Sequence, residues 1–495
     1  MTSGLARKTA VGVAWTTSAR AAVRLLGLLS TLFLARLLAP SDFGLVAMAT
    51  TVASGLELLT LFNFDMALVQ TKQLTRADYD SAWTLNMLMG IALSLALIAA
   101  AAPVAAFYRE PRLQYVMWPV ALKYLIDSAG NPGTVDFRRA LEFRPDFYLQ
   151  VGPKIAGVLA ILPLALWLRD YRALLAGMLI TASVSCVLSY VLHPHRPTWC
   201  LVQARRLIRF SRWLLLNNMM GFLRTRSADL IIGRMLGSGA LGIYAVAAEI
   251  SNLPSTEMVA PINRVLFPSY VHLADDPDRL RAGFRSTLGL IALLILPVCV
   301  GLAALADPLV HVMLGEKWLQ AIPLIALLAI AGAVIVLQAT TGSVYNALGL
   351  PRMIALTGAI HAVTLIPILL VASSELGMQG IAWAVVIHGA TVGIVSTYWL
   401  FLRTTPIRFA DVLQICWRPI VACAAMFVAL RSLMDALGPF NGFFDSLTGL
   451  LAGCVVGCLV YVIATSLLWA LARWPDGAEA TAFRRVVVGF QRSAR

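Results

Sequence analysis

Apolar stretches long enough to cross a lipid bilayer recur along the whole chain. A membrane-spanning helix needs about 20 mostly apolar residues, because each residue adds 1.5 Å along an axis that crosses about 30 Å of hydrocarbon. The pattern predicts an all-α polytopic membrane protein with about fourteen such helices. We place them at residues 11–36, 43–69, 82–107, 116–133, 149–168, 171–192, 212–236, 241–270, 286–313, 319–347, 353–372, 379–402, 412–431 and 447–472.

Composition excludes a soluble protein with a single anchor. The 495 residues are 59% hydrophobic and 13% charged, whereas a soluble chain carries about 25% charged residues. The first apolar segment contains Arg20 and Arg24, so we expect no cleavable signal peptide. The seven cysteines show no CxxC spacing, and we predict neither a metal site nor a cofactor.

One segment occurs twice, 198 residues apart. Residues 36–45 read RLLAPSDFGL and residues 234–243 read RMLGSGALGI, and each copy joins two apolar helices. The repeat predicts two pseudo-symmetric six-helix lobes, followed by two C-terminal helices. Duplicated bundles are common in secondary transporters, so transport is favoured over catalysis.

The predicted domains follow from this duplication. They are an N-terminal lobe (1–195), a cytoplasmic amphipathic linker (196–211), a C-terminal lobe (212–402), two additional helices (403–472) and a basic tail (473–495).

Basic residues are distributed unequally between the two sides of the predicted bundle. The loops on the side of both termini hold about 23 Lys and Arg residues, and the opposite loops hold about six. This asymmetry predicts cytoplasmic termini. It also accounts for most of the net charge of +14, so no nucleic-acid partner is needed.

Several short motifs resemble a known family. Ala35-Arg36-Leu37-Leu38 with Asp42-Phe43-Gly44 is followed by Arg139-Ala140-Leu141-Glu142-Phe143, Asp229-Leu230-Ile231-Ile232-Gly233 and Leu314-Gly315-Glu316-Lys317-Trp318. Their order and spacing, over roughly residues 10 to 400, resemble the bacterial polysaccharide flippases. These are the O-antigen and exopolysaccharide (Wzx-type) transporters of the multidrug/oligosaccharidyl-lipid/polysaccharide (MOP) exporter superfamily. Arg352 departs from the pattern, because Leu350-Pro351 separates it from Gly349.

The resemblance implies that the two six-helix lobes surround a central cavity, and it also implies a function and partners. It implies that undecaprenyl-pyrophosphate-linked oligosaccharides cross the bacterial inner membrane by alternating access, for O-antigen, capsule or exopolysaccharide synthesis. It further implies a lipid-linked oligosaccharide substrate, the surrounding bilayer, a polysaccharide polymerase and a chain-length regulator as partners. The coupling ion stays open between a proton and sodium.

An anionic substrate needs fixed positive charge inside the bundle, since ionised groups facing lipid are disfavoured. Arg20 and Arg24 share one face of the first helix, four residues apart, and favour substrate binding over pairing with the neighbouring helix or snorkelling. The full set of candidate pyrophosphate-binding residues is Arg24, Arg224, Arg20, Arg264 and Lys154. Lys154 could equally well snorkel to the cytoplasmic surface instead of binding substrate. Arg264 could equally well neutralise Glu257 instead of contributing to the cavity.

Other polar residues in the spans are candidates for charge pairing or ion coupling. They are Glu57, Asp65, Asn217, Arg226, Asp229 and Glu257. The three-residue spacing of Arg226 and Asp229 predicts an ion pair, as does the four-residue spacing of Lys123 and Asp127. Two histidines in the spans, His361 and His388, are more typical of satisfied interior side chains than of proton carriers.

Three other functions compete with this interpretation. A peptidoglycan-precursor flippase has similar needs, and only the motif order disfavours it. An ion-coupled multidrug exporter of the same superfamily would favour an acidic cavity. A membrane-embedded polymerase or glycosyltransferase is the remote alternative, because the predicted periplasmic loops are short. We therefore predict that the protein is not an enzyme.

Overall fold

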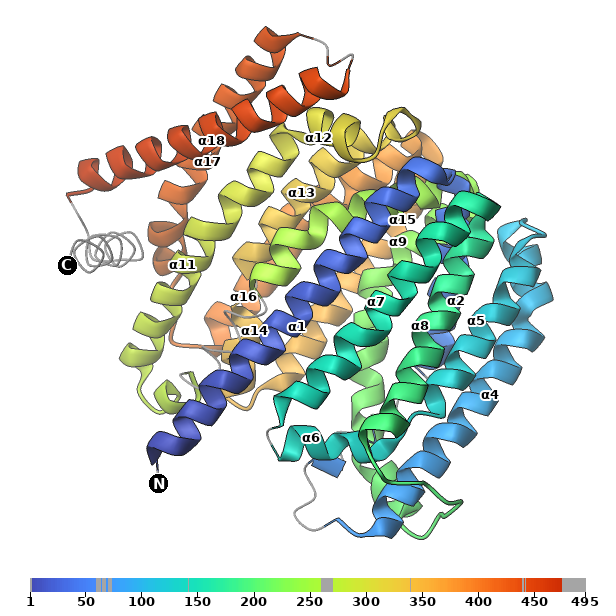
Figure 1. Ribbon diagram of the computed structural model, residues 1–495. Helices are drawn as coiled ribbons and strands as arrows, with labels where there is room; N and C mark the ends of the chain where they lie inside the picture. Colours follow the sequence, from blue (N-terminus) through green and yellow to red (C-terminus); the bar gives the residue numbers. More distant parts are fainter. Residues whose placement is uncertain are drawn as a thin grey trace, which may run out of the picture. The chain divides into compact units, whose positions relative to one another are not determined.

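The computed structural model describes residues 2–58, 64, 68–69, 74–140, 142–259, 270–338, 340–438, 440 and 442–473, without the side chains of residues 2–11, 13–14, 205–218, 220 and 224. Within these residues every regular element is helical, which confirms the all-α class (Figure 1). In chain order they are α1 (Thr2–Leu37), α2 (Pro40–Glu57), α4 (Arg76–Tyr108), α5 (Leu113–Ser128), η1 (Pro132–Thr134), α6 (Val135–Arg139), α7 (Phe143–Leu168), α8 (Tyr171–Leu192), α9 (Ala204–Leu253), η2 (Pro254–Met258), α11 (Pro277–Ala304), α12 (Ala306–Met313), η3 (Glu316–Trp318), α13 (Ala321–Gln338), α14 (Thr341–Ala347), α15 (Pro351–His388), η4 (Gly389–Gly393), α16 (Ile394–Thr404), α17 (Phe409–Leu437) and α18 (Phe443–Leu471).

The described helices overlap the predicted spans, although parts of the spans 43–69 and 241–270 lie outside the described residues. The predicted span 171–192 coincides with α8. Two long helices contain a non-helical glycine, Gly237 in α9 and Gly377 in α15, and each glycine falls between two predicted spans. In the described part, ten helical stretches are long and apolar enough to cross a membrane, so the number fourteen stays a prediction.

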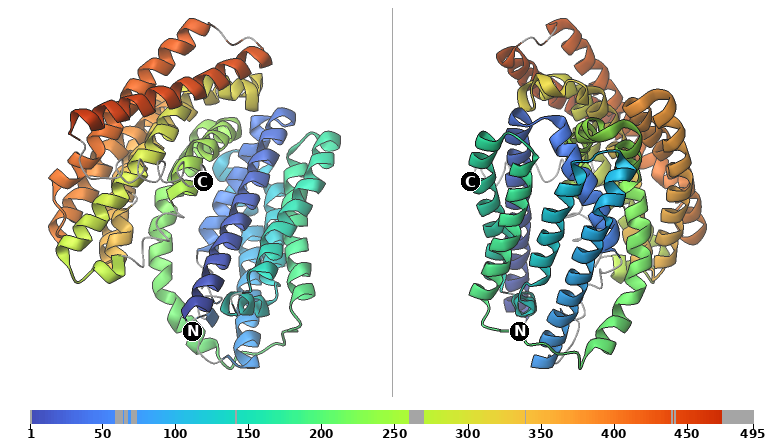
Figure 2. Two further views of the ribbon diagram at one scale, coloured as in Figure 1. Left: turned by 60° about the vertical axis from the view of Figure 1, so that its left-hand side comes forward. Right: turned by 90° about the vertical axis from the view of Figure 1, so that its right-hand side faces the viewer.

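The chain forms two compact units, Met1–Ala245 and Val246–Arg495. In the first unit α1 packs along α7, and α7 packs along α8 (Figure 2). Trp15 and Phe147 meet edge to face with ring centroids 5.1 Å apart at one end of the α1–α7 contact. Leu34 and Ile161 join one apolar cluster toward the other end. The domain boundaries taken from the sequence remain predictions.

The segment that precedes α9 is extended and tied to the first unit. The buried Asn131 side chain donates to the carbonyl oxygens of His193 and His195, at 3.2 and 2.9 Å. Asp80 accepts from the Thr198 hydroxyl at 2.8 Å and lies 3.1 Å from Nε2 of His195. Burial lowers the pKa of the His193 imidazole below its ordinary value. Helical structure in the predicted linker therefore begins only with α9.

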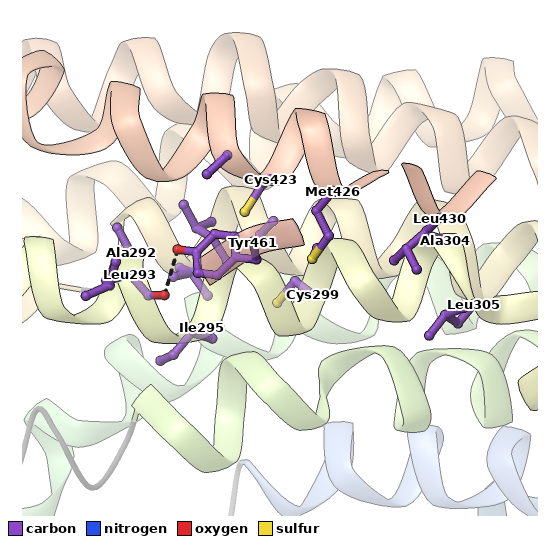
Figure 3. Close-up of a cluster of buried hydrophobic side chains, with 14 of the residues drawn as sticks. Ala292, Leu293, Ile295, Cys299, Ala304, Leu305, Cys423, Met426, Leu430 and Tyr461 are labelled. Carbon is purple, nitrogen blue, oxygen red and sulfur yellow. Dashed lines mark hydrogen bonds between the residues drawn. The ribbon is translucent and has the colours of Figure 1, made fainter. Parts of the chain in front are cut away.

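In the second unit, the C-terminal helices α17 and α18 pack on α11 through a buried apolar cluster (Figure 3). Pro297 lies inside α11 and has no N–H, so the carbonyl of Leu293, four residues earlier, has no partner in its own helix. The Tyr461 hydroxyl of α18 donates to this carbonyl at 2.8 Å. A side chain from a neighbouring helix thus satisfies the backbone group that the proline exposes.

Replacing Tyr461 with Phe should therefore destabilise the second unit by about 1–3 kcal/mol, because a buried carbonyl loses its donor. Unfolding of the purified protein in detergent measures this loss. In a Pro297→Ala background, where the introduced alanine supplies a helical N–H to the Leu293 carbonyl, the same Tyr461→Phe change should cost much less. An equal cost in both backgrounds would contradict this account of the hydrogen bond.

Candidate functional site

Three of the predicted cationic side chains belong to one pair of helices in the first unit. A Cβ atom placed on Gly27 of α1 would lie 3.5 Å from Nζ of Lys154 on α7. Arg24 lies three residues before Gly27 and therefore on the same side of α1. Arg24 is half-buried, and Arg20, one turn earlier, is exposed. The structure brings Lys154 next to the helix face that carries Arg24.

Arg24 and Lys154 lie on helices that are long and apolar enough to cross a membrane. Gly27 is near the middle of the apolar helix Trp15–Leu37, and Lys154 is near the middle of Phe143–Leu168. The predicted span 149–168 placed Lys154 near a helix start, from which its side chain reaches the water interface. In the structure α7 begins six residues earlier, at Phe143, and the choice between snorkelling and substrate binding for Lys154 stays open. An ammonium group at this depth needs an aqueous or anionic environment.

A second polar cluster joins α2 and α5. Lys123 and Asp127 form an ion pair with Nζ 2.9 Å from the carboxylate, in agreement with their spacing. The Lys123 ammonium also lies 4.2 Å from the ring centroid of Tyr124. The Tyr124 hydroxyl is hydrogen-bonded to the Glu57 carboxylate. Glu57 is thus engaged with α5, in a cluster where charges of both signs meet.

The predicted pair on α9 is also present. Arg226 donates to Asp229 at 2.9 Å, and Asp229 is buried while the Arg226 side chain remains 48% exposed. The carboxylate therefore holds the guanidinium from one side and leaves donors on the other side for water or an anion. This geometry fits charge pairing and is compatible with a cavity wall.

The other candidate site residues are not part of these clusters. Asp65 and Arg264 lie outside the described residues. The backbone of Arg224 and Asn217 is part of α9, but their side chains are outside the described set. Glu257 is exposed in the π-helical turn Pro254–Met258. Among the described residues no group of His, Cys, Asp and Glu side chains is arranged to hold a metal ion.

The two copies of the sequence repeat touch each other inside the first unit. A Cβ on Gly44 would overlap the carbonyl of Ser238, and a Cβ on Gly242 would overlap the carbonyl of Pro40. Gly242 in the second copy corresponds to Gly44 in the first, and Ser238 corresponds to Pro40, because both pairs are 198 residues apart. Such reciprocity is what a two-fold axis between the copies produces. We refer to residues 40–44 packed on residues 238–242 as the repeat contact.

Side chains from the end of α4 and from the turn between α4 and α5 flank the repeat contact. Glu110 accepts from the Ser238 hydroxyl at 3.2 Å and pairs with Arg112 at 2.9 Å. The hydrogen bond from the Arg112 guanidinium lowers the pKa of the Glu110 carboxyl below its ordinary value. Arg234 lies over the ring of Phe107, 5.5 Å from its centroid. Arg234, which corresponds to Arg36 in the first copy of the repeat, therefore has a structural partner in Phe107.

Comparison with known proteins identifies the family. Residues 33–323, more than half of the chain, match the polysaccharide biosynthesis protein family. The chain belongs to this family. The resemblance inferred from the motifs is thereby confirmed.

Relatives and a solved structure extend the likeness. An uncharacterized membrane protein from the cps region of Klebsiella pneumoniae is 25% identical over 428 residues, which cover 86% of this chain and 88% of its own. The succinoglycan biosynthesis transport protein ExoT of Rhizobium meliloti (strain 1021) is 25% identical over 446 residues, 87% of each chain. The lipid II flippase MurJ in an inward closed conformation has a TM-score of 0.69 at 13% identity, over 91% of this chain and 98% of that one. The protein is therefore a multi-pass membrane protein with the MOP fold.

Sequence reasoning missed the repeat contact as an element of the site. The signal was available, since both copies carry glycine at equivalent positions, Gly44 and Gly242. A glycine in a helix contact of a membrane protein usually permits close backbone approach. What the pattern does not indicate is that the two glycines meet each other.

The repeat contact gives a matched set of substitutions. Gly44→Ala and Gly242→Ala should each force the backbones apart and lower polysaccharide export, with similar effects because the contact is reciprocal. Gly239→Ala is the control, since a Cβ there meets nothing within 4 Å. Surface polysaccharide normalised to protein in the membrane is the measurement. Normal export in both variants, or an equal loss in the control, would contradict the role of close packing.

Proposed function

We propose that this protein is a flippase for lipid-linked oligosaccharides. It moves undecaprenyl-pyrophosphate-linked repeat units across the bacterial inner membrane by alternating access, for the synthesis of O-antigen, capsule or exopolysaccharide. The observation that carries the proposal is the cationic face of α1 and α7, with Lys154 beside Gly27 and Arg24 on the same side. Family membership and the relative named as a succinoglycan biosynthesis transport protein support it.

The chemistry of this face suits a pyrophosphate. Arg24 offers a planar fork of donors that matches phosphate oxygens, and Lys154 offers a compact positive charge. Both lie near the middle of their helices, where an anion has no other favourable environment. We assign Arg24 and Lys154 to the diphosphate. Arg20, Arg224 and Arg264 are further candidates on its path.

The mixed-charge cluster suits a different part of the substrate. Lys123, Tyr124, Asp127 and Glu57 offer donors and acceptors without a large net charge, as neutral sugar hydroxyls require. Arg226 and Asp229 continue this polar surface on α9. We assign these groups to the wall along which the sugar moves.

The proposed setting follows from the same function. Both termini lie in the cytoplasm, and the substrate enters from the cytoplasmic leaflet. A polymerase and a chain-length regulator act on the delivered units, and a proton or sodium ion moves in the opposite direction. The membrane potential also favours outward movement of negative charge, by about 2.3 kcal/mol per charge per 100 mV.

A peptidoglycan-precursor flippase is the second candidate, favoured by the likeness to the lipid II flippase fold. Mass spectrometry of membrane lipids, with leaflet assignment, separates the two. Loss of the protein should accumulate an undecaprenyl-pyrophosphate oligosaccharide in the cytoplasmic leaflet. Accumulation of a peptidoglycan precursor instead would favour the second candidate, and unchanged lipid-linked sugars would move drug export forward.

Substitution of the cationic face tests the site. Arg24→Ala and Lys154→Ala should each reduce surface polysaccharide about 30-fold or more, because losing a charged partner to a phosphate costs at least about 2 kcal/mol. Arg24→Lys should retain part of the activity, since the charge stays while the bidentate fork is lost.

The matched control is Arg431→Ala, which removes an exposed arginine from α17. It should leave export unchanged at equal protein levels in the membrane. Normal polysaccharide in Arg24→Ala, in Lys154→Ala and in the double variant would exclude this face as the substrate site.

A further inference from the structure

Two turns of the first unit share one sequence pattern. Residues 107–112, from the end of α4 to the start of α5, read FYREPR, and residues 167–172, from the end of α7 to the start of α8, read WLRDYR. Each segment has an aromatic residue, an arginine two positions later, an acidic residue directly after it and a second arginine two positions further on. The segments are 60 residues apart, so this pattern is separate from the 198-residue repeat. We refer to residues 107–112 and 167–172 as the twin turns.

The first arginine of each twin turn has a left-handed backbone. Arg109 has φ 54° and Arg169 has φ 52°, directly after the last residue of α4 and of α7. A residue with a Cβ atom is strained in this region, and helices that end in this way usually have glycine there. Among the described residues, Arg473 is the one other non-glycine residue with a positive φ. A strained arginine at two equivalent positions indicates a use for its side chain.

The acidic residue of each twin turn engages the second arginine. Glu110 accepts two hydrogen bonds from the Arg112 guanidinium, at 2.9 and 3.0 Å. In the other turn, a carboxylate oxygen of Asp170 lies 3.6 Å from Nε of Arg172. The negative charge of each turn is therefore balanced by its second arginine, and the first arginine is left as the excess charge.

This excess charge lies at the surface of the predicted hydrocarbon layer. α4 and α7 are both long and apolar enough to cross a membrane. Phe107 and Trp167, two residues before each first arginine, are 51% and 80% exposed, and exposed aromatic residues at the ends of membrane helices lie at the level of the lipid headgroups. The side chains of Arg109 and Arg169 are exposed and form no hydrogen bond or ion pair with the described residues. Each twin turn therefore presents one uncompensated guanidinium at this level.

The twin turns also run against the usual distribution of basic residues. The side of the bundle that we predict to be periplasmic holds about six Lys and Arg residues, and four of them belong to the twin turns. In membrane proteins the excess of basic residues is normally on the cytoplasmic side. A concentration of arginine at two matching turns on the opposite side favours an anionic partner there.

Both twin turns lie beside the repeat contact, at the end of the first unit opposite its N-terminus (Figure 1). Glu110 of the first turn accepts from the Ser238 hydroxyl at 3.2 Å. The carboxylate of Asp42 lies beside the backbone N–H of Tyr171 in the second turn and near the charge of Arg112 in the first. The repeat contact therefore holds the two turns next to each other.

A phosphate group attached to a lipid fits this arrangement. The planar fork of a guanidinium matches two phosphate oxygens. At the headgroup level, an aromatic ring contacts the apolar part of the same lipid while the arginine binds its phosphate. A soluble anion would gain nothing from the aromatic residue. The combination of both residue types in each turn therefore favours an anion that belongs to the membrane.

We propose that the twin turns are two adjacent binding sites for lipid-borne phosphate groups on the periplasmic surface. Arg109 and Arg169 bind the phosphate oxygens, and Phe107 and Trp167 contact the adjoining lipid. The phosphate belongs either to an anionic phospholipid of that leaflet or to the diphosphate of a delivered lipid-linked oligosaccharide, which need the same donors. Binding of a lipid phosphate does not depend on the proposed flippase function, whereas reception of the delivered diphosphate rests on it.

Glycine substitutions separate binding from a structural role. Glycine adopts the left-handed backbone without strain, so the double variant Arg109→Gly/Arg169→Gly should unfold at an equal or higher temperature. Native mass spectrometry of the purified full-length protein measures its affinity for phosphatidylglycerol and for undecaprenyl diphosphate. The double variant should bind its lipid at least about tenfold more weakly. Arg109→Lys/Arg169→Lys should be intermediate, since the charge stays while the fork is lost.

Arg473→Gly is the matched control. It replaces an exposed arginine with the same left-handed backbone, just after α18, on the side that we predict to be cytoplasmic. It should leave the affinity for both lipids unchanged. An equal loss of affinity in this control would show that the effect is not specific to the twin turns and would overturn the proposal.

The two lipids distinguish the two sources of the phosphate. A loss of affinity for phosphatidylglycerol assigns the twin turns to the bilayer, and a loss for undecaprenyl diphosphate assigns them to the delivered substrate. Unchanged affinity for both lipids in Arg109→Gly/Arg169→Gly would overturn the sites. A lower unfolding temperature with unchanged binding would show a structural role instead. Inorganic diphosphate that binds as tightly as the lipids would exclude a lipid ligand.

The outcome is separable from that of the proposed substrate site, because lipid binding is measured without export. If Arg24→Ala and Lys154→Ala leave export normal while Arg109→Gly/Arg169→Gly loses phosphatidylglycerol, the cationic face of α1 and α7 fails as the substrate site. The twin turns then stand as sites for a lipid phosphate.

Discussion

In hydrocarbon no water is present to hydrogen-bond the backbone, so each peptide group needs a partner within the protein. This constraint explains why every regular element in the described chain is a helix. It also explains what happens where a helix is interrupted. Pro297 deprives the Leu293 carbonyl of its helical donor, and Tyr461 from α18 replaces it. The two C-terminal helices are thereby attached to α11 by a specific polar contact as well as by apolar packing.

Glycines allow backbone arrangements in this protein that other residues would not permit. At Gly237 and Gly377 glycine allows the chain to reverse between two helices. At Gly44 and Gly242 it allows two backbones to approach each other where any side chain would overlap a carbonyl. The close approach at Gly44 and Gly242 depends on the duplication. Gly44 of the first copy faces Ser238 of the second, and Gly242 of the second copy faces Pro40 of the first. Internal symmetry and close packing are therefore one feature of this protein.

Charge placement follows from the cost of ionised groups in a bilayer. Acidic and basic residues of the first unit are paired on α5 and on α9, while Lys154 of α7 lies beside Gly27, on the side of α1 that carries Arg24. In the second unit the rings of His361 and His388 pack edge to face, with centroids 5.6 Å apart.

The sequence by itself determined the class of the protein, the positions of its helices and its family. Apolar length, the 198-residue repeat and the order of short motifs are local properties, and they need no tertiary information. The ion pairs of Lys123 with Asp127 and of Arg226 with Asp229 were equally predictable, because helical spacing alone brings them together. Only the tertiary structure decided that Lys154 reaches Gly27, that Gly44 meets Gly242 and that His361 meets His388. These contacts join residues far apart in the chain, and which helix faces meet depends on how whole helices pack, which no spacing in the sequence expresses.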